Sequence, residues 1–563
     1  MTRAADLFRR KAASVVKEKA NAEAASAVPA ASGAEVSDVG AAAVGREMTA
    51  GRKQAIAAKE AAGAARLAAL AAQKAAREEH ERAINPNIAK TPIRREVPLR
   101  KPKVVVRIRP LASSGGHSNE GEPVSKRLAS YGNGKIVLED EMGVDYGGAR
   151  AAHARTTEYT FAQAILGPES RQAEVHEAAA AELVQAVCAD GLNGGEGYNA
   201  LLFAYGQTGT GKTHTIFGPE PSWTSLRHEQ SGILPRAVAS ILDTMRARAG
   251  RISSVLSCSA LEFYMSSCLD LLDEGATCLI GADHRPLGFT TLELDSEQAC
   301  LDLMARVRKT RHARATRMNE ASDGHAGSSR SHCAIILTLR QLERSSARVL
   351  TTRLDVIDMA GAERPRSVQS TLLAMWDHEK GVEPTIAGQG LVINYELSQL
   401  RTAVVQATEQ HYKGLPLVNT KAAGTEFIEY TKGCFDGSAL LSMIVTLSPA
   451  HSCGWETWFS CTYGEDLQRL RCPVQPQKPK PLARLLAAAE AAVKRAADDL
   501  ELGDTNGANP KYMARRACQL RHETRTLEEL RRLAALGADG KSALSRDGGG
   551  LFDGLLDGLC VIS

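Results

Sequence analysis

The sequence has few features of membrane, disulfide-rich or metal-cluster proteins. No run of about 18 apolar residues occurs in the 563 residues, so a membrane span is not expected. The twelve cysteines form no CxxC pair and no Cys/His cluster at metal-ligand spacing. This argues against a disulfide framework and a zinc site, and it fits a reducing cytoplasm.

No sign of charge dominates, and aromatic residues are scarce. Lys and Arg number 69 against 65 Asp and Glu, a net charge of +4, which gives no support for nucleic acid as the main partner. Aromatics make up 4% although 44% of residues are hydrophobic, because alanine is abundant, mainly in the two flanks. The flanks are therefore expected to be helix-prone, and the middle of the chain is long enough for a large core.

Residues 206–213 read GQTGTGKT, a phosphate-binding loop of the form GxxxxGK[ST]. Its glycines let successive backbone N–H groups turn toward phosphate oxygens at the start of a helix. Lys212 is then expected to reach the β- and γ-phosphates, and the Thr213 hydroxyl to ligate Mg²⁺. The preceding residues 200–205 (ALLFAY) are short and apolar, which predicts a buried strand that leads into the loop.

Two further motifs have the chemistry of a γ-phosphate sensor. Residues 328–332 read SSRSH, and residues 358–363 read DMAGAE after an alternating apolar strand, 349–357. A sensor needs an acid near Mg²⁺, a glycine N–H that approaches phosphate, and polar loop groups that close over it. Asp358, Gly361 and Ser328/Ser329 have those types.

Arg330 and Glu363 are expected to pair across the two loops when ATP is bound, which would confine the attacking water. A guanine-specific GTPase is the nearest competing class. It would normally have an NKxD-type motif after the switches, but 419–422 (NTKA) lacks both the order and the acid. ATP is therefore the expected nucleotide.

Residues 107–110 read RIRP directly after the expected strand 104–106. With RxRP, GQTGTGKTHT, SSRSH and DxxGxE in this order, the sequence resembles the kinesin motor family. The resemblance covers about residues 101–472, and it includes GILPRA from Gly232 and LSP from Leu447.

The resemblance implies an α/β phosphate-loop NTPase fold, in which a central β-sheet is covered by helices on both faces. The composition of the flanks adds the expectation of helical N- and C-terminal extensions. It implies a microtubule motor of the cytoplasmic cytoskeleton that hydrolyses ATP with Mg²⁺ when microtubules stimulate it. Arg109 and Pro110 would lie beside the adenine, and Asn394 would stand in the long switch helix.

The remaining roles are carried over position by position. The expected ATP-binding residues are Arg107, Arg109, Pro110, Gly206, Gln207, Thr208, Gly209, Thr210, Gly211, Lys212, Thr213 and His214. The expected catalytic residues are Lys212, Ser329, Arg330, Gly361 and Glu363. The expected Mg²⁺ ligands are Thr213, Ser329 and Asp358.

The sequence departs from the family pattern at the switches. Extra residues (ASDGHAG) separate Asn319 from SSRSH, so the first switch loop is longer. Residues 393–397 read INYEL where the family has an INKSL-like helix start, and 417–423 read LVNTKAA where it has a basic segment resembling YRDSKLT. The replaced positions belong to the family's microtubule-facing surface.

That surface has no excess of positive charge. Residues 364–432 contain seven Lys/Arg and seven Asp/Glu, whereas tubulin is strongly acidic and a docking surface is expected to be basic. The alternative source of affinity expected from the sequence is its alanine-, lysine- and arginine-rich flanks.

Five regions are expected: an extension at 1–95 that is partly helical and partly disordered, a motor domain at 96–472, a proline-rich linker at 473–481, two short helices at 482–537, and a flexible tail at 538–563. Helices are expected at 174–189 and 234–248. The linker has four prolines and should be extended. It shows no convincing match to the neck segment of plus-end-directed family members, so direction stays open.

The first C-terminal helix has a heptad seam that includes Leu482, Leu486, Ala489 and Val493. The second should begin with Asn509 as cap and Pro510 at its first position, and end before Gly537. The seams allow two outcomes, helices that fold back on the motor or each other, and a homodimer. The final CVIS matches a prenylation signal at Cys560, which would give a weak membrane tether, and the alternative is an unmodified tail.

Three functional hypotheses follow. The first is a divergent kinesin-like ATPase, favoured by the intact phosphate loop and switch residues. The second is a degenerate motor fold that binds nucleotide or tubulin as a scaffold without cycling, favoured by the neutral surface and the lengthened switch. A third is an ATPase that depolymerises microtubule ends without stepping.

Overall fold

The computed structural model describes residues 99–111, 128–140, 155–191, 196–265, 267–281, 284–319, 330–362, 386–412, 425–435, 437–450, 453–505 and 509–538. All of them lie in one compact unit, Val97–Ser563. Within these residues, no helix is both long enough and apolar enough to span a membrane.

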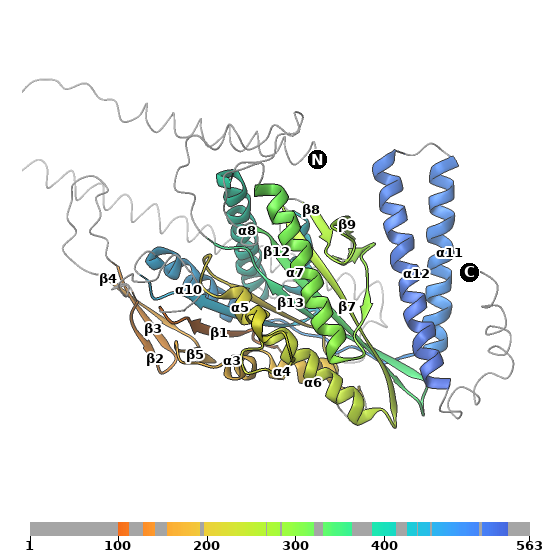
Figure 1. Cartoon of the computed structure of the whole chain (residues 1–563), viewed down its shortest axis with the longest axis horizontal. Coiled ribbons are helices and arrows are strands. Elements are labelled where there is room, and N and C mark those ends of the chain that lie inside the picture. Colours follow the sequence, from red (N-terminus) through yellow and green to blue (C-terminus); the bar gives the residue numbers. More distant parts are fainter. Residues whose placement is uncertain are drawn as a thin grey trace, which may run out of the picture. The chain divides into compact units, whose positions relative to one another are not determined.

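A twelve-stranded mixed sheet forms the centre of this unit (Figure 1). Its strand order is β10-β9-β8-β7-β12-β13-β6-β14-β1-β5, with β11 beside β7 and β15 beside β13. The strands are β1 (Lys103–Ile108), β5 (Ala164–Leu166), β6 (Ala200–Tyr205), β7 (Ile252–Tyr264), β8 (Ser267–Asp270), β9 (Ala276–Ile280), β10 (Pro286–Leu287), β11 (Leu292–Glu293), β12 (His332–Glu343), β13 (Arg348–Asp358), β14 (Leu440–Leu447) and β15 (Lys480–Pro481). A separate three-stranded sheet contains β2 (Leu128–Gly132), β3 (Lys135–Asp140) and β4 (Arg155–Thr160).

Four neighbouring strands, β13, β6, β14 and β1, run parallel to one another. Their carboxyl ends therefore meet at one edge of the sheet, where ligands of open α/β sheets bind. This edge brings together Asp358 at the end of β13, the glycine loop after β6, and the residues after β14 and β1. The three strands expected from the sequence at 104–106, 200–205 and 349–357 are confirmed as β1, β6 and β13.

Helices cover both faces of the sheet, as expected (Figure 1). One core packs α3 (Gln172–Ala179), α4 (Ala181–Cys188), α6 (Ile233–Arg248) and α7 (Glu297–Asn319) on the sheet. The other packs α8 (Ile386–Tyr412), α9 (Glu426–Phe435) and α10 (Gly454–Arg469) on the opposite face. Strand β6 lies between the two cores and is buried along its whole length, which fits its unbroken apolar sequence.

The helical stretch expected at 174–189 is present but consists of two helices, α3 and α4. Ala180 breaks the helix with φ −122° and ψ −30°, and its N–H bonds to the His176 carbonyl. The break lets two short helices each place apolar residues in the core, Val175 in α3 and Leu183 in α4. No glycine or proline marks this position, so the sequence carried no local signal of it.

The proline-rich segment is extended, as expected, and it runs along the sheet. Gln477 forms an antiparallel β-bridge with Gly197. Strand β15 pairs with the first residues of β13, with Lys480 opposite Val349. The Arg348 guanidinium also donates to the Pro479 carbonyl (2.6 Å). The segment is therefore bound to the core before the first C-terminal helix begins.

The C-terminal helices α11 (Leu482–Thr505) and α12 (Pro510–Ala538) form a hairpin that packs on the end of the sheet (Figure 1). The Asn509 side chain caps α12 by accepting from the Tyr512 N–H (2.9 Å), which confirms the expected start. The helix was expected to end before Gly537, but it continues through Gly537 and ends at Ala538. A Cβ at Gly537 would meet Leu342 at 2.6 Å, so this glycine permits close packing on β12.

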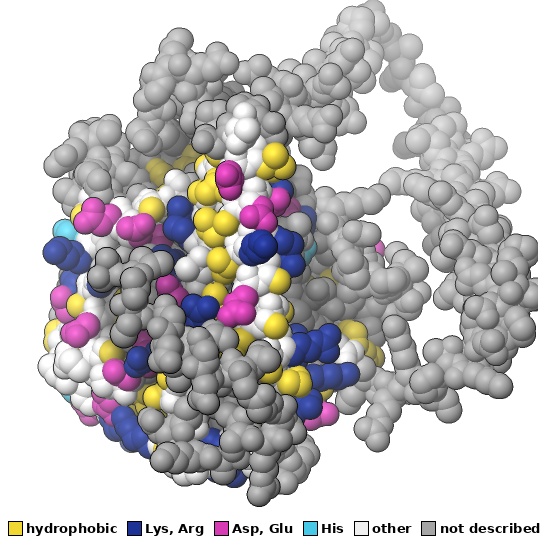
Figure 2. All heavy atoms as spheres, turned by 90° about the vertical axis from the view of Figure 1, so that its right-hand side faces the viewer, with side chains coloured by type: hydrophobic (Ala, Val, Ile, Leu, Met, Phe, Trp, Pro, Cys, Tyr) yellow, Lys and Arg dark blue, Asp and Glu magenta, His cyan; other side chains and the backbone are white. Residues whose placement is uncertain are grey.

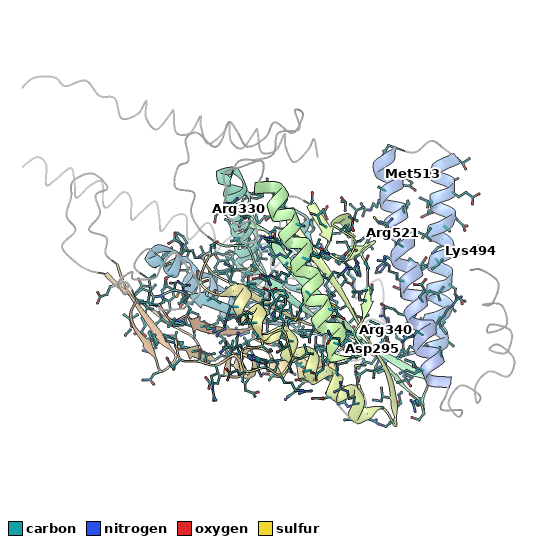
Figure 3. All side chains as sticks on the ribbon, viewed as in Figure 1. Asp295, Arg330, Arg340, Lys494, Met513 and Arg521 are labelled. Carbon is teal, nitrogen blue, oxygen red and sulfur yellow. The ribbon has the colours of Figure 1, made fainter. Side chains whose placement is uncertain are left out.

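The expected heptad seam is used inside the chain. Leu482 and Ala489 are buried with Leu527, Leu530 and Leu533 of α12 and with apolar residues of the sheet. Arg340 of β12 lies beside the lower part of α12 (Figure 3), where it pairs with Glu529. Viewed from the side of the hairpin, both signs of charge and a column of apolar side chains are visible (Figure 2). On α11 the exposed apolar positions include Ala483, Ala487 and Ala491.

Candidate nucleotide site

The glycine loop connects β6 to the short helix α5 (Lys212–Ile216). Gly211 adopts φ +95° at the start of the helix, and Gly209 adopts φ +81°, conformations that favour glycine. A Cβ at Gly206 would meet the Thr446 carbonyl oxygen at 2.3 Å, so the loop can lie this close to β14 only with glycine here. The strand, the turn and the helix that the motif requires are therefore present.

Lys212 is buried in the loop although it carries a charge. Its ammonium donates to the carbonyl oxygens of Gly206 (2.9 Å) and Gln207 (2.8 Å). These bonds hold the positive charge over the turn, where phosphate oxygens would be attracted both to the ammonium and to the backbone N–H groups.

Thr213 and Asp358 meet across the site, as expected for two ligands of one metal ion. The Thr213 hydroxyl donates to Asp358 Oδ2 (2.7 Å). Among the described residues, the other carboxylate oxygen, Oδ1, is buried without a hydrogen-bond partner. A hydroxyl next to a carboxylate with a buried oxygen to spare fits Mg²⁺, which prefers oxygen ligands. Ser329, the third expected ligand, lies outside the described residues.

The segment that follows β13, residues 359–362, contacts the glycine loop directly. The N–H of Ala362 donates to the Gly206 carbonyl (3.2 Å), so Gly361, one residue earlier, is held beside the loop. Arg330 lies two residues before β12, is half-buried and is labelled in Figure 3. Its expected partner Glu363 and the loop residue Ser328 lie outside the described residues, so their pairing stays a prediction.

Arg311 of α7 is a site residue that the sequence reading missed. It is 7% exposed, and its guanidinium lies 3.3 Å from Asp358 Oδ2 and 3.9 Å from Glu262 Oε1. Glu262 in turn accepts a hydrogen bond from the Ser331 hydroxyl (2.7 Å). Burial alone would lower the pKa of Arg311, but nearby acidic groups, Asp358 and Glu262 among them, outweigh it and raise this pKa. No motif marks Arg311, since its role depends on where α7 crosses the sheet.

Arg107 supports the loop from behind. Its guanidinium donates to Thr215 Oγ1 of α5 (2.8 Å) and to Gln172 Oε1 (2.9 Å), and burial lowers its pKa to about 10. Gln172, which the sequence reading also missed, donates to the His214 carbonyl (2.8 Å). These bonds fix the helix that carries Lys212 and Thr213.

Arg109 and Pro110 lie at the rim of the same edge. The Arg109 N–H bonds to the Leu447 carbonyl (3.0 Å), and its guanidinium reaches Ser448 Oγ (3.4 Å). Pro110 is exposed. The RIRP motif is thus next to the LSP stretch, which begins with the last residue of β14. Both lie on the same edge of the sheet as the glycine loop.

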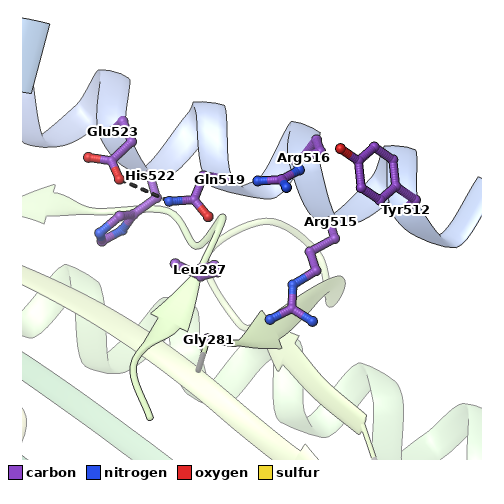
Figure 4. Close-up of a pocket in the computed structure, with 8 residues that line it drawn as sticks. All are labelled: Gly281, Leu287, Tyr512, Arg515, Arg516, Gln519, His522 and Glu523. Carbon is purple, nitrogen blue, oxygen red and sulfur yellow. Dashed lines mark hydrogen bonds between the residues drawn. The ribbon is translucent and has the colours of Figure 1, made fainter. Parts of the chain in front are cut away.

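A cavity of about 570 Å³ lies elsewhere, between α12 and the β9–β10 region (Figure 4). Its lining includes Arg516, which already pairs with Asp499 (3.0 Å), and Glu523, an acid that would repel phosphate. None of the expected nucleotide-binding residues lines it. The site chemistry therefore belongs to the glycine loop and not to this cavity.

The comparisons with known proteins agree with the motifs. The family model described as the kinesin motor domain matches residues 107–470. Kinesin-like protein KIF15 of Mus musculus is 28% identical over 378 residues, 64% of this chain and 24% of the relative. Kinesin heavy chain of Caenorhabditis elegans is 27% identical over 318 residues, 55% of this chain and 34% of the relative.

A solved structure described as a fast kinesin is 21% identical and covers 67% of this chain and 93% of its own, with a TM-score of 0.48. The chain spans 24% and 34% of the length of these two curated relatives.

Proposed function

Because this chain belongs to the kinesin motor-domain family, we propose that it is a microtubule motor that binds and hydrolyses ATP with Mg²⁺. The observation that carries the proposal is the Thr213–Asp358 contact (2.7 Å), which joins the phosphate loop to the second switch strand. A metal ion held there would be sensed by both. The contact of Ala362 with Gly206 gives the switch a second tie to the loop.

The roles proposed for Lys212, Thr213 and Asp358 follow from their contacts, and those of Ser329, Arg330 and Glu363 follow from the family's motifs. Lys212 and the backbone N–H groups of the loop bind and orient the phosphates. Thr213 and Asp358, with Ser329, would hold Mg²⁺, which would supply positive charge against the phosphates. Arg330 and Glu363 close over the γ-phosphate and exclude bulk water.

The proposed microtubule surface is supported by family membership and not by charge. Helices α8 and α9 contain two Lys/Arg and four Glu between them. Both cations are paired within the chain, Arg401 with Asp466 (2.7 Å) and Lys432 with Glu429 (3.0 Å). This favours, as the second candidate, a scaffold that binds nucleotide or tubulin without turnover.

Steady-state ATP hydrolysis with and without polymerised tubulin tests the proposal. The wild type should hydrolyse ATP faster when polymerised tubulin is present. K212A and E363A should lose at least about 100-fold in the stimulated rate, since each removes a group that acts on the transferring phosphoryl group. E177A, which removes an exposed glutamate of α3, is the matched control and should keep the rate.

Other results would separate the candidates. Binding of nucleotide or tubulin with no turnover in the wild type would contradict the motor and support the scaffold. Shortening of stabilised microtubules without directed movement would support the depolymerising ATPase. A homodimer through the C-terminal helices and a membrane tether at Cys560 remain proposals, and Cys560 lies outside the described residues.

A further inference from the structure

A buried acidic residue on α8, Glu396, faces the first residue of β12. Glu396 is 2% exposed, and its neighbours on the same stripe of α8 are core residues, Ile393, Leu397 and Leu400. A carboxylate at a core position costs folding free energy unless a partner compensates it. Packing alone does not explain why a glutamate occupies this core position of α8.

The partner of Glu396 is His332, the first residue of β12. Nε2 of His332, which is fully buried, lies 3.3 Å from Glu396 Oε2. The two groups are at ion-pair distance but are not aligned as a hydrogen bond. The ring is stacked on Phe427 of α9 with centroids 3.9 Å apart, so it is held between β12 and the helix layer.

The other ring nitrogen of His332 is bound to the segment that follows β13. The Ala360 N–H donates to His332 Nδ1 (3.2 Å). Because Nδ1 accepts this bond it carries no proton, so the ring proton of the neutral imidazole is on Nε2, toward Glu396. The imidazole thus accepts a hydrogen bond from Ala360, two residues after β13, through Nδ1, and its Nε2 lies at ion-pair distance from Glu396 of α8.

A continuous chain of contacts therefore runs from the phosphate loop to α8. Gly206 is bound by Ala362, two residues from Ala360, and Ala360 is bound to His332, which faces Glu396. If Ala360 shifts when Asp358 and Gly361 engage a nucleotide, the ring must follow or lose its bond. Since the contact with Glu396 is poorly aligned, a small rotation of α8 would change it substantially.

We propose that His332 and Glu396 are positioning residues that transmit the state of the nucleotide site to α8. The inference deepens the proposed function, because the movement it transmits originates at the proposed ATP site. Glu396 stands where the family's INKSL-like start has its fourth residue, serine, so the acid is one of this chain's departures from that pattern.

The first test is amide hydrogen exchange of the full-length protein without nucleotide. E396L replaces the carboxylate with an apolar side chain of similar size and so removes the acceptor. E396Q keeps an acceptor for the Nε2 proton. E396L should speed exchange in residues 358–362 by about five-fold or more, and E396Q should stay within about two-fold of wild type. I336V, a small loss of packing in β12 away from the chain of contacts, is the matched control and should stay within about two-fold.

The second test adds Mg²⁺ and a non-hydrolysable ATP analogue. In the wild type, exchange in α8 should change on binding. H332N retains an acceptor for Ala360 but loses the Nε2 donor, so H332N and E396L should bind the analogue within about three-fold of wild type while the response of α8 falls by about five-fold or more.

The outcomes keep the inference separate from the proposed function. If the wild type binds no adenine nucleotide, the proposed function fails and the first test still decides whether the two sites are linked. If α8 responds in E396L as in the wild type, or if E396L matches I336V in the first test, the inference is overturned and the ATPase is unaffected.

Discussion

At the residue scale, the nucleotide site depends on groups whose charges are buried against one another. Asp358 is 2% exposed and is shared between Thr213 and Arg311. Removing one partner of such a set leaves an uncompensated buried charge, which costs more than the contact itself contributes. Arg311 is the informative position, because no nucleotide motif contains it.

We predict that R311M lowers the free energy of unfolding by about 3–5 kcal/mol, because Asp358 and Glu262 would lose their buried cation. Chemical denaturation measures this. R308M is the matched control on the same helix, since Arg308 pairs with Glu220 at the surface, where a pair contributes about 0–1 kcal/mol. Equal losses for the two variants would show that Arg311 is not a structural cation of the site.

At the element scale, the C-terminal hairpin and the extended segment before it form one connected structure. Leu482 begins α11 fully buried, and its N–H bonds to the Ala347 carbonyl (2.9 Å) directly after β15. Helix α12 is bound to the sheet by Arg340–Glu529 and by Arg532–Glu293. The segment at 473–481 is thus held at its far end by the hairpin.

L533D should release the hairpin from the sheet, because it places an unpaired charge at a fully buried position of α12. Amide exchange in residues 473–538 should become at least about ten-fold faster, while β6 and β14 keep their protection. L502D makes the same substitution at a residue of α11 that is 61% exposed, and should have little effect. If L533D exchanges like L502D, the hairpin does not depend on this core.

At the scale of the whole molecule, positive charge is concentrated at the N-terminal end. Residues 1–95 contain 17 Lys/Arg and 10 Asp/Glu, a net +7, so the rest of the chain is net −3 against the total of +4. Since the cations of α8 and α9 are paired, long-range attraction to an acidic polymer should come mainly from residues 1–95.

Removing residues 1–95 should weaken binding to polymerised tubulin by about ten-fold at low ionic strength and flatten its dependence on salt, since screening acts on exposed charges. Co-sedimentation over a salt series measures both. Removal of residues 539–563, which carry a net charge of −2, is the matched control and should not weaken binding. An unchanged salt dependence after the N-terminal deletion would contradict the prediction.

The sequence alone determined the parts of this protein that depend on local chemistry. The turn at Gly206–Thr213 needs particular residues at fixed spacing, so a motif revealed it, and the strands β1, β6 and β13 were visible from their apolar runs. The cap at Asn509 and the extended prolines are likewise set by neighbours along the chain.

The tertiary structure decided what depends on residues distant in sequence. Arg311, Gln172, His332 and Glu396 acquire their partners only because helices cross the sheet at particular places, and no pattern of neighbours encodes those crossings. The break at Ala180 and the passage of α12 through Gly537 were set by packing on the sheet, which outweighs local propensity. For the same reason the heptad seam, which allowed either a partner chain or a fold-back, found its apolar surface within its own chain.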